Sequence, residues 1–231
     1  MTARSALVTG GTTGLGLAIA HRLAGMGLGI TVTGRDPSKL AAAVAELEGA
    51  GASVVGTVAD AADWDDTVRA VAAHVERHGG LDVAVANAGF TTAGDLVDGD
   101  PGAWRSMVLT NVLGPALLIK ATVPHLLAPG GQIVLVGSVA GRVIRAGSLY
   151  SVTKHAVASL GENARLQLTA SGIRVATVEP GVVDTPFWDE TGMPPVSLHA
   201  GVVADAVAWI VDQPAGVEVG EIVVRPTGQL I

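Results

Sequence analysis

Residues 5–16 read SALVTGGTTGLG, an apolar run that passes directly into a turn with four glycines. The run Ser5–Thr9 predicts a buried strand, and a helical pattern follows from about Leu15 to Met26. Glycines in such a turn let the backbone approach a pyrophosphate, and the helix N-terminus presents unpaired N–H groups to it. The spacing alone is weak in a chain with 31 glycines, where a flexible turn is the alternative. Its position between a strand and a helix favours a dinucleotide-binding turn.

The same alternation of short β-branched runs and longer Ala-rich patterns continues along the chain. Further strands are expected at residues 29–33, 53–58, 81–85, 132–136, 173–178 and 221–224, and further helices from residue 37 and at 63–78, 101–127, 149–170 and 202–211. Strands joined by helices lie parallel with right-handed connections. We therefore expect an α/β Rossmann fold, a doubly wound parallel sheet of about seven strands with helices on both faces, as one domain over residues 1–231. Ligands of such sheets bind beyond the carboxyl ends of the strands.

Composition excludes several kinds of protein and site. The chain has 231 residues, of which 49% are hydrophobic, so a large core is expected and disorder is not. The net charge of −7 and the scattered Lys and Arg disfavour nucleic-acid binding. Without Cys the chain has no disulfide or thiolate chemistry, and its dispersed His predict no metal site. Because no signal peptide is apparent and charges and glycines interrupt every apolar run before about 18 residues, we expect a cytoplasmic protein without a membrane partner.

The end of the second strand indicates which dinucleotide binds. An acidic residue about 20 residues after the glycine turn would hold the ribose 2′-hydroxyl of NAD. Here the sequence is Gly34-Arg35-Asp36, and Asp36 before Pro37 is typical of a helix cap. The Arg35 guanidinium suits a 2′-phosphate, which favours NADP(H). A solvated arginine at a helix start is the alternative.

The only Tyr of the chain, Tyr150, precedes Lys154 by four residues. On a helix this spacing places both side chains on one face. A phenol with a pKa of about 10 is a slow acid or base near neutrality, and a nearby ammonium is expected to bring its pKa toward the working range. Ser138 follows the fifth strand, where its hydroxyl would donate to a developing alkoxide. These residues predict proton transfer at a carbonyl or alcohol.

Together these motifs resemble the short-chain dehydrogenase/reductase family over nearly the whole chain. The resemblance rests on residues 9–16, Asn87-Ala88-Gly89, Asn111, Ser138, Tyr150 with Lys154, and Pro180-Gly181. It implies that Tyr150 is the general acid/base, that Lys154 holds the nicotinamide ribose and lowers the Tyr150 pKa, and that Ser138 orients the substrate oxygen. Asn111 would support a water that links Lys154 to solvent. A non-catalytic NADP(H)-binding regulator of the same fold is the alternative function.

The resemblance also implies a set of cofactor-binding residues. They are Gly10, Thr12, Thr13, Gly14, Leu15, Gly16, Arg35, Asp60, Asn87, Ala88, Gly89, Tyr150, Lys154, Pro180, Gly181, Val183 and Thr185. Asp60 would meet the adenine and Asn87 the adenosine ribose, although helix capping for Asp60 and a backbone-satisfying role for Asn87 and Asn111 are alternatives. Two departures from the family pattern stand out: Ser138 and Tyr150 are one residue closer than usual, and Thr13 stands where NADP-preferring members often have a basic residue.

The substrate region is expected to be mostly apolar. Its candidate residues are Phe90, Thr91, Thr92, Val139, Ala140, Leu149, Phe187, Trp188 and Met193, the last three from a substrate lid over residues 184–199. Arg142 and Arg145 are interpreted as solvent-exposed charge, with a carboxylate anchor as the alternative. The ending Val217–Thr227 is similar to NADP-dependent 3-hydroxy acid dehydrogenases. Family members assemble as dimers or tetramers, which implies a homo-oligomer through residues 115–123 and 156–168.

Overall fold

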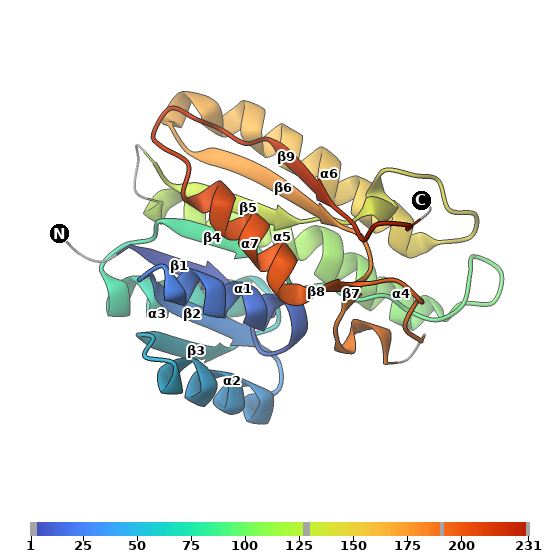
Figure 1. The fold of residues 1–231 in the computed structure, drawn as a ribbon, viewed down its shortest axis with the longest axis horizontal. Helices are drawn as coiled ribbons and strands as arrows, with labels where there is room; N and C mark the ends of the chain where they lie inside the picture. The colour runs from blue at the N-terminus through green and yellow to red at the C-terminus, as the bar shows by residue number, and fades with distance from the viewer. Residues whose placement is uncertain (1–3, 127–129, 190–191, 230–231) are drawn as a thin grey trace.

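The computed structural model describes residues 4–126, 130–189 and 192–229, and its centre is one parallel sheet (Figure 1). The strand order is β3-β2-β1-β4-β5-β6-β9. The strands are β1 Ser5–Val8, β2 Gly29–Gly34, β3 Val54–Val58, β4 Val83–Ala86, β5 Gln132–Val136, β6 Arg174–Pro180 and β9 Glu221–Val224. All six pairings are parallel. The expected doubly wound α/β sheet is confirmed.

Helices cover both faces of this sheet (Figure 1). One face carries α1 (Gly14–Gly25), α2 (Pro37–Gly49) and α7 (Ala200–Val211), and the other carries α3 (Trp64–His78), α4 (Pro101–Val108), α5 (Gly114–Thr122) and α6 (Leu149–Leu168). Successive residues of a strand point to opposite faces, so Val8 joins the core under α1 while Leu7 joins the core under α3 and α5. Strands buried on both faces explain the high apolar content.

The helix expected at residues 101–127 has an interruption. Between α4 and α5 the backbone forms a π-helical turn, Leu109–Leu113, and a 3-10 turn, Val123–His125, ends the run. By length and composition Pro101–His125 would be able to cross a membrane, although Gly102, Arg105, Gly114 and Lys120 interrupt its apolar residues as expected. In the fold, Met107 and Leu118 of this run are buried in the protein interior.

The expected lid at residues 184–199 is anchored at both ends. Strand β7 (Val183–Asp184) pairs in parallel with β8 (Leu198–His199), and a 3-10 turn, Pro186–Trp188, follows β7. The backbone N–H of Leu198 also donates to the Val182 carbonyl, at 2.8 Å. Residues 190 and 191 of this segment lie outside the described residues.

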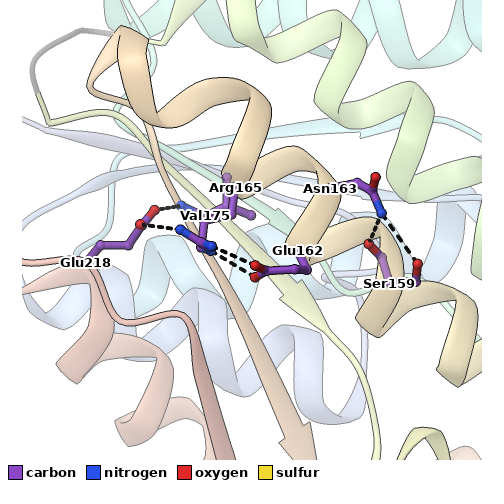
Figure 2. A network of polar contacts seen from close by, with 6 residues as sticks. All are labelled: Ser159, Glu162, Asn163, Arg165, Val175 and Glu218. Carbon is purple, nitrogen blue, oxygen red and sulfur yellow. Dashed lines mark hydrogen bonds and ion pairs between the residues drawn. The ribbon is translucent and has the colours of Figure 1, made fainter.

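A polar network connects α6 with the segment before β9 (Figure 2). Arg165 of α6 donates from Nε to Glu162 at 2.8 Å, and its Nη1 lies 3.6 Å from Glu218. Glu218 in turn accepts the backbone N–H of Val175 in β6, at 3.1 Å. Surface ion pairs of this kind each contribute at most about 1 kcal/mol. Their role here is to hold the segment that leads into the edge strand β9.

Candidate active site

A cavity of about 930 Å³ opens where the carboxyl ends of the strands meet. It begins between the loops after β1 and β4, which are neighbouring strands whose crossovers leave in opposite directions. This is where open α/β sheets bind their ligands. All the predicted cofactor residues line the cavity, and so do Ser138, Tyr150 and Lys154. Of the predicted catalytic and cofactor-binding residues, only Asn111 does not.

The glycine turn has a shape that side chains would prevent. Gly14 has a φ of +54°, in the left-handed region, and a Cβ on Gly16 would lie 2.2 Å from the Gly10 carbonyl oxygen. The side-chain amide of Asn87 holds the turn from the β4 side, because its Nδ2 donates to the Thr9 and Gly10 carbonyl oxygens at 3.0 and 3.1 Å. The Asn87 side chain therefore bonds to backbone carbonyls, as the alternative interpretation has it. Asn87 also lines the cavity.

The N-terminus of α1 offers its amides to this cavity. Thr13 at the N-cap makes no side-chain hydrogen bond to the first turn. By contrast, Asp36, Asp63, Asp100 and Ser148 cap α2, α3, α4 and α6 with their side chains. A helix N-terminus without a side-chain cap, bordered by glycines, is suited to phosphate oxygens. The residues present thus fit the diphosphate of a dinucleotide.

The end of β2 places two cations at the cavity. Arg35 lines it with its guanidinium 6.0 Å from the centre of the Phe90 ring, and Lys39 lines it one helical turn later. Lys39 was missed from the sequence, where nothing distinguished it from other helix residues. Asp36 accepts N–H groups of Lys39 and Ser38, which hold the pKa of its carboxyl below the usual range. The predicted cap is thereby confirmed, and Asp36 does not line the cavity.

Asp60 forms a loop of its own at the end of β3. Its Oδ1 accepts the Ala62 N–H at 2.9 Å, and its own N–H donates to Asp66 at 2.8 Å. That donation is the main reason why the pKa of Asp66 is low, with the Arg69 side chain second. Asp63, not Asp60, caps α3. Asp60 therefore lines the cavity in a fixed conformation instead of capping the helix.

Asn111 sits in the π-helical turn, where it is 1% exposed. It accepts the Phe90 N–H at 3.0 Å and donates to the Phe90 carbonyl at 2.9 Å and to Thr153 Oγ1 at 3.1 Å. A Cβ on Gly89 would lie 3.1 Å from Asn111 Oδ1 and 3.7 Å from Lys154 Nζ, so a glycine separates the two side chains. Asn111 thus holds the loop after β4 by its backbone, and its part in proton supply stays a prediction.

Ser138 and Tyr150 meet despite the short loop between them. A 3-10 turn, Val139–Gly141, follows Ser138, whose Oγ accepts the Ala140 N–H at 3.1 Å. Tyr150 is half-buried, and burial raises the pKa of its phenol to about 12, while the Ser138 side chain and the charge of Arg145 lower it. The loop that is one residue short therefore still brings the two hydroxyls together.

The expected lowering of the Tyr150 pKa by Lys154 stays a prediction, because burial has the larger effect on the phenol in this structure. Lys154 Nζ lies 5.7 Å from the centre of the Tyr150 ring and donates to the Val136 carbonyl at 2.9 Å. Burial lowers the Lys154 pKa to about 8, and the charge of Glu179 partly offsets this. Burial of the phenol thus outweighs the nearby positive charge, and the cation that lowers its pKa is Arg145.

The end of β6 and the residues after it close the cavity at Tyr150. Pro180, Gly181, Val183 and Thr185 line it as expected, and a Cβ on Gly14 would touch Thr185 at 3.1 Å. Phe187 packs against Tyr150 with 5.6 Å between ring centres. The glycine turn, this segment and the phenol are therefore in one continuous wall.

Most of the expected substrate wall is present. Phe90, Thr91, Thr92, Val139, Ala140, Phe187 and Trp188 line the cavity, whereas Leu149 and Met193 do not. The polar residues that were missed here are Thr33, Asp100, Thr110, Asp189 and Gln229. Of the two loop arginines, Arg145 lines the cavity and is exposed, whereas Arg142 pairs with Glu179 at 3.1 Å and with Glu221, away from any substrate.

Known proteins resemble this chain in sequence and in fold. Residues 4–194 match the family model described as short chain dehydrogenase. An uncharacterized oxidoreductase of Staphylococcus saprophyticus is 33% identical over 96% of both chains, and dehydrogenase/reductase SDR family member 4 of Bos taurus is 40% identical over 80% of this chain and 69% of its own length. An alcohol dehydrogenase of the archaeon Thermococcus sibiricus, solved with 5-hydroxy-NADP, superposes with a TM-score of 0.90 at 28% identity, covering 99% of this chain and 98% of its own.

Proposed function

The chain belongs to the short-chain dehydrogenase/reductase family and is an oxidoreductase; from this premise we propose that it transfers a hydride between NADP(H) and a carbonyl or secondary alcohol. One observation carries the proposal. One continuous cavity of about 930 Å³ has a glycine turn with an uncapped helix N-terminus at one end and Ser138, Tyr150 and Lys154 at the other. A dinucleotide has two such ends, one for its diphosphate and one for its nicotinamide.

Different residues of the cavity would bind different parts of the cofactor. The amides of the glycine turn and of the first turn of α1 would bind the diphosphate. Asp60 and Ala88 would border the adenosine part, and Pro180, Gly181, Val183 and Thr185 would hold the nicotinamide carboxamide. When bound, the nicotinamide supplies or accepts the hydride.

NADP(H) is favoured over NAD(H) by the charges at the end of β2. Arg35 and Lys39 both line the cavity there, and a 2′-phosphate adds negative charge that they would pair. No acidic residue at the end of β2 lines the cavity, because Asp36 caps α2 and stands outside the lining. The NADP analogue bound to the archaeal relative agrees with this choice.

Tyr150 would act as the general acid in carbonyl reduction. A phenol with a pKa near 12 is fully protonated at neutral pH, and the protonated form is the one that gives its proton to the substrate oxygen. Ser138, which lines the same cavity as the phenol, would donate a second hydrogen bond to that oxygen. Lys154 would bind the nicotinamide ribose and place its charge near the reacting atoms. Reduction is therefore the direction that the resting protonation state supports.

Replacement of Tyr150 by Phe tests this assignment. The variant keeps the ring that packs against Phe187 and loses only the hydroxyl. We expect NADPH oxidation with a panel of aldehydes, ketones, 3-oxo acids and quinones to fall by a factor of about 100 or more, while NADPH binding measured by fluorescence changes little. A variant with full turnover would contradict the role of Tyr150. NADPH binding without turnover by the wild type on the whole panel would instead favour the regulator, which the comparisons do not.

Replacement of Arg35 by Ala tests the choice of cofactor. We expect the Kd for NADPH to rise by a factor of about ten, since a charge-assisted contact is worth roughly 1.5–3 kcal/mol, and the Kd for NADH to stay the same. Equal affinities of the wild type for NADPH and NADH, unchanged in the variant, would refute the preference.

A further inference from the structure

Glu179 is a buried carboxylate that the proposed chemistry does not use. It stands at the carboxyl end of β6, directly before Pro180, and only 1% of its surface is exposed. Taking an ionised carboxylate out of water costs several kcal/mol unless opposite charges and hydrogen bonds compensate. An ionised Glu179 therefore needs opposite charges or hydrogen-bond donors nearby.

The side chain of Glu179 faces the same side of the sheet as Lys154. Thr177, two residues earlier on β6, meets α6, because a Cβ on Gly161 of that helix would lie 2.3 Å from Thr177 Oγ1. Side chains two residues apart on a strand share a face, so Glu179 also faces α6. Its Cγ lies against Gly137, and the Lys154 ammonium donates to the Val136 carbonyl one residue earlier. Both charged groups thus approach the end of β5 from the α6 side.

Four other charged or titratable groups surround this pair. Arg142, in the loop before α6, donates to Glu179 Oε2 at 3.1 Å and also pairs with Glu221 of β9. His155 of α6 acts on Glu179 through its charge, as Lys154 does. Tyr150, on the same helix face as Lys154, is neutral at the pH values considered. Burial raises the pKa of Glu179, and Arg142, His155 and Lys154 oppose this, in that order.

We propose that Glu179 is a positioning residue whose carboxylate keeps the Lys154 ammonium protonated in its dry site. Arg142 holds the carboxylate in place, and the negative charge of the carboxylate stabilises the protonated form of Lys154. The consequence for catalysis rests on the proposed function, but the protonation state of Lys154 does not.

The charges set the direction of the effect. Burial lowers the Lys154 pKa to about 8, and Glu179 is the one charge that raises it. We expect removal of this opposite charge, which lies on the same side of the sheet, to lower the lysine pKa by about one unit. Lys154 would then lose its proton near pH 7, and the site would lose its positive charge within the working range.

The first test measures Lys154 directly in the protein without cofactor. The chain has only three lysines, Lys39, Lys120 and Lys154, so ¹³Cε-lysine labelling gives three NMR signals that K39R and K120R assign. We expect the Lys154 midpoint to fall by about one pH unit in E179Q. E221Q is the matched control, because it also removes a carboxylate from Arg142 but leaves Glu179 in place, and we expect the wild-type midpoint there.

Three results would overturn the proposal. They are an unchanged Lys154 midpoint in E179Q, an equal fall in E221Q, and a wild-type midpoint well below pH 7. The last of these needs no variant, so the proposal stays testable if E179Q does not fold. E179D keeps the charge, and we expect its Lys154 midpoint to lie between those of the wild type and E179Q.

The second test is the pH profile of carbonyl reduction. With a Lys154 pKa near 8 in the wild type and about one unit lower in E179Q, kcat/KM at pH 8 should lie about twofold below the low-pH plateau in the wild type and about elevenfold below it in E179Q. E179D should restore the basic limb, and a merely structural role would lower the whole profile without moving that limb. A shifted NMR midpoint with no turnover in any variant would refute the proposed reaction and leave the role of Glu179 intact.

Discussion

A drop in pH from 7.5 to 5.5 is expected to lower the free energy of unfolding by about 1.4 kcal/mol through His74 alone. His74 of α3 is fully buried between β1 and β2. Its Nδ1 lies 2.8 Å from Thr31 Oγ1, and its Nε2 lies 3.0 Å from Ser5 Oγ. Because the Ser5 hydroxyl donates to the Gly80 carbonyl at 2.9 Å, it accepts from Nε2–H, and the neutral ring then accepts from Thr31.

The magnitude follows from the difference in pKa between the two states. Burial, and after it the charge of His78, lower the pKa of folded His74 from 6.5 to about 4. Below pH 6.5, His74 therefore becomes protonated in the unfolded chain but stays neutral in the folded protein. Because the pKa of His74 is lower in the folded state, His74 stabilises the fold fully above its unfolded-state pKa. This stabilisation is lost as the pH falls toward the folded-state pKa. The whole contribution is about 3 kcal/mol, of which about 1.4 kcal/mol is lost by pH 5.5.

Urea unfolding at pH 7.5 and 5.5, on the wild type and on His74→Gln, measures this contribution. The variant can keep hydrogen bonds to Ser5 and Thr31 but does not titrate, so the other groups of the chain cancel in the comparison. We expect the wild type to lose about 1.4 kcal/mol more than the variant between the two pH values. Equal losses in the two proteins would refute the assignment, whatever the stability of the variant at pH 7.5.

Three further predictions concern the site and the assembly. Gly16→Ala should abolish measurable NADPH binding in a fluorescence titration, because its Cβ would lie 2.2 Å from the Gly10 carbonyl oxygen; unchanged binding would refute the tight turn. Alcohol oxidation should have its optimum at higher pH than carbonyl reduction, because the Tyr150 phenol, with a pKa near 12, must lose its proton to act as a base; coincident optima in steady-state assays would contradict this. Light scattering should find a dimer or tetramer, since Val152 and Leu166 are 58% and 62% exposed on α6; a monomer would refute it.

Periodicity was sufficient to predict the fold. The seven main strands lie within about three residues of their expected ends, because strands buried on both faces stand out as β-branched runs between helical patterns. The π-helical turn at Leu109–Leu113 was not predictable, since its residues continue a helical pattern on both sides. Its cause is tertiary, as Asn111 bonds to the backbone of Phe90 on another element.

The site was predictable where residue type and strand end coincide, as at Ser138 and Arg35. The site was not predictable where residues far along the sequence fold back to the cavity. Gln229 lies after the last strand, yet its Oε1 accepts the Val182 N–H at 3.0 Å and it lines the cavity, because β9 is the neighbour of β6. The balance of charges was also hidden: the spacing of Tyr150 and Lys154 places them on one face but does not reveal that burial dominates the pKa of both.

The two asparagines show how the cavity wall is made rigid. Asn87 gives both amide hydrogens to carbonyls of the glycine turn, and Asn111 exchanges hydrogen bonds with both backbone groups of Phe90. The segment between them, Ala88-Gly89, is therefore fixed at one end to the loop after β1 and at the other to the π-helical turn. An amide is needed at each position because it offers a donor and an acceptor, whereas a carboxylate at residue 87 would face two carbonyl oxygens. The part of the wall that borders the cofactor cleft is thus shaped by side-chain to backbone bonds before any ligand binds, which reduces the ordering cost of binding.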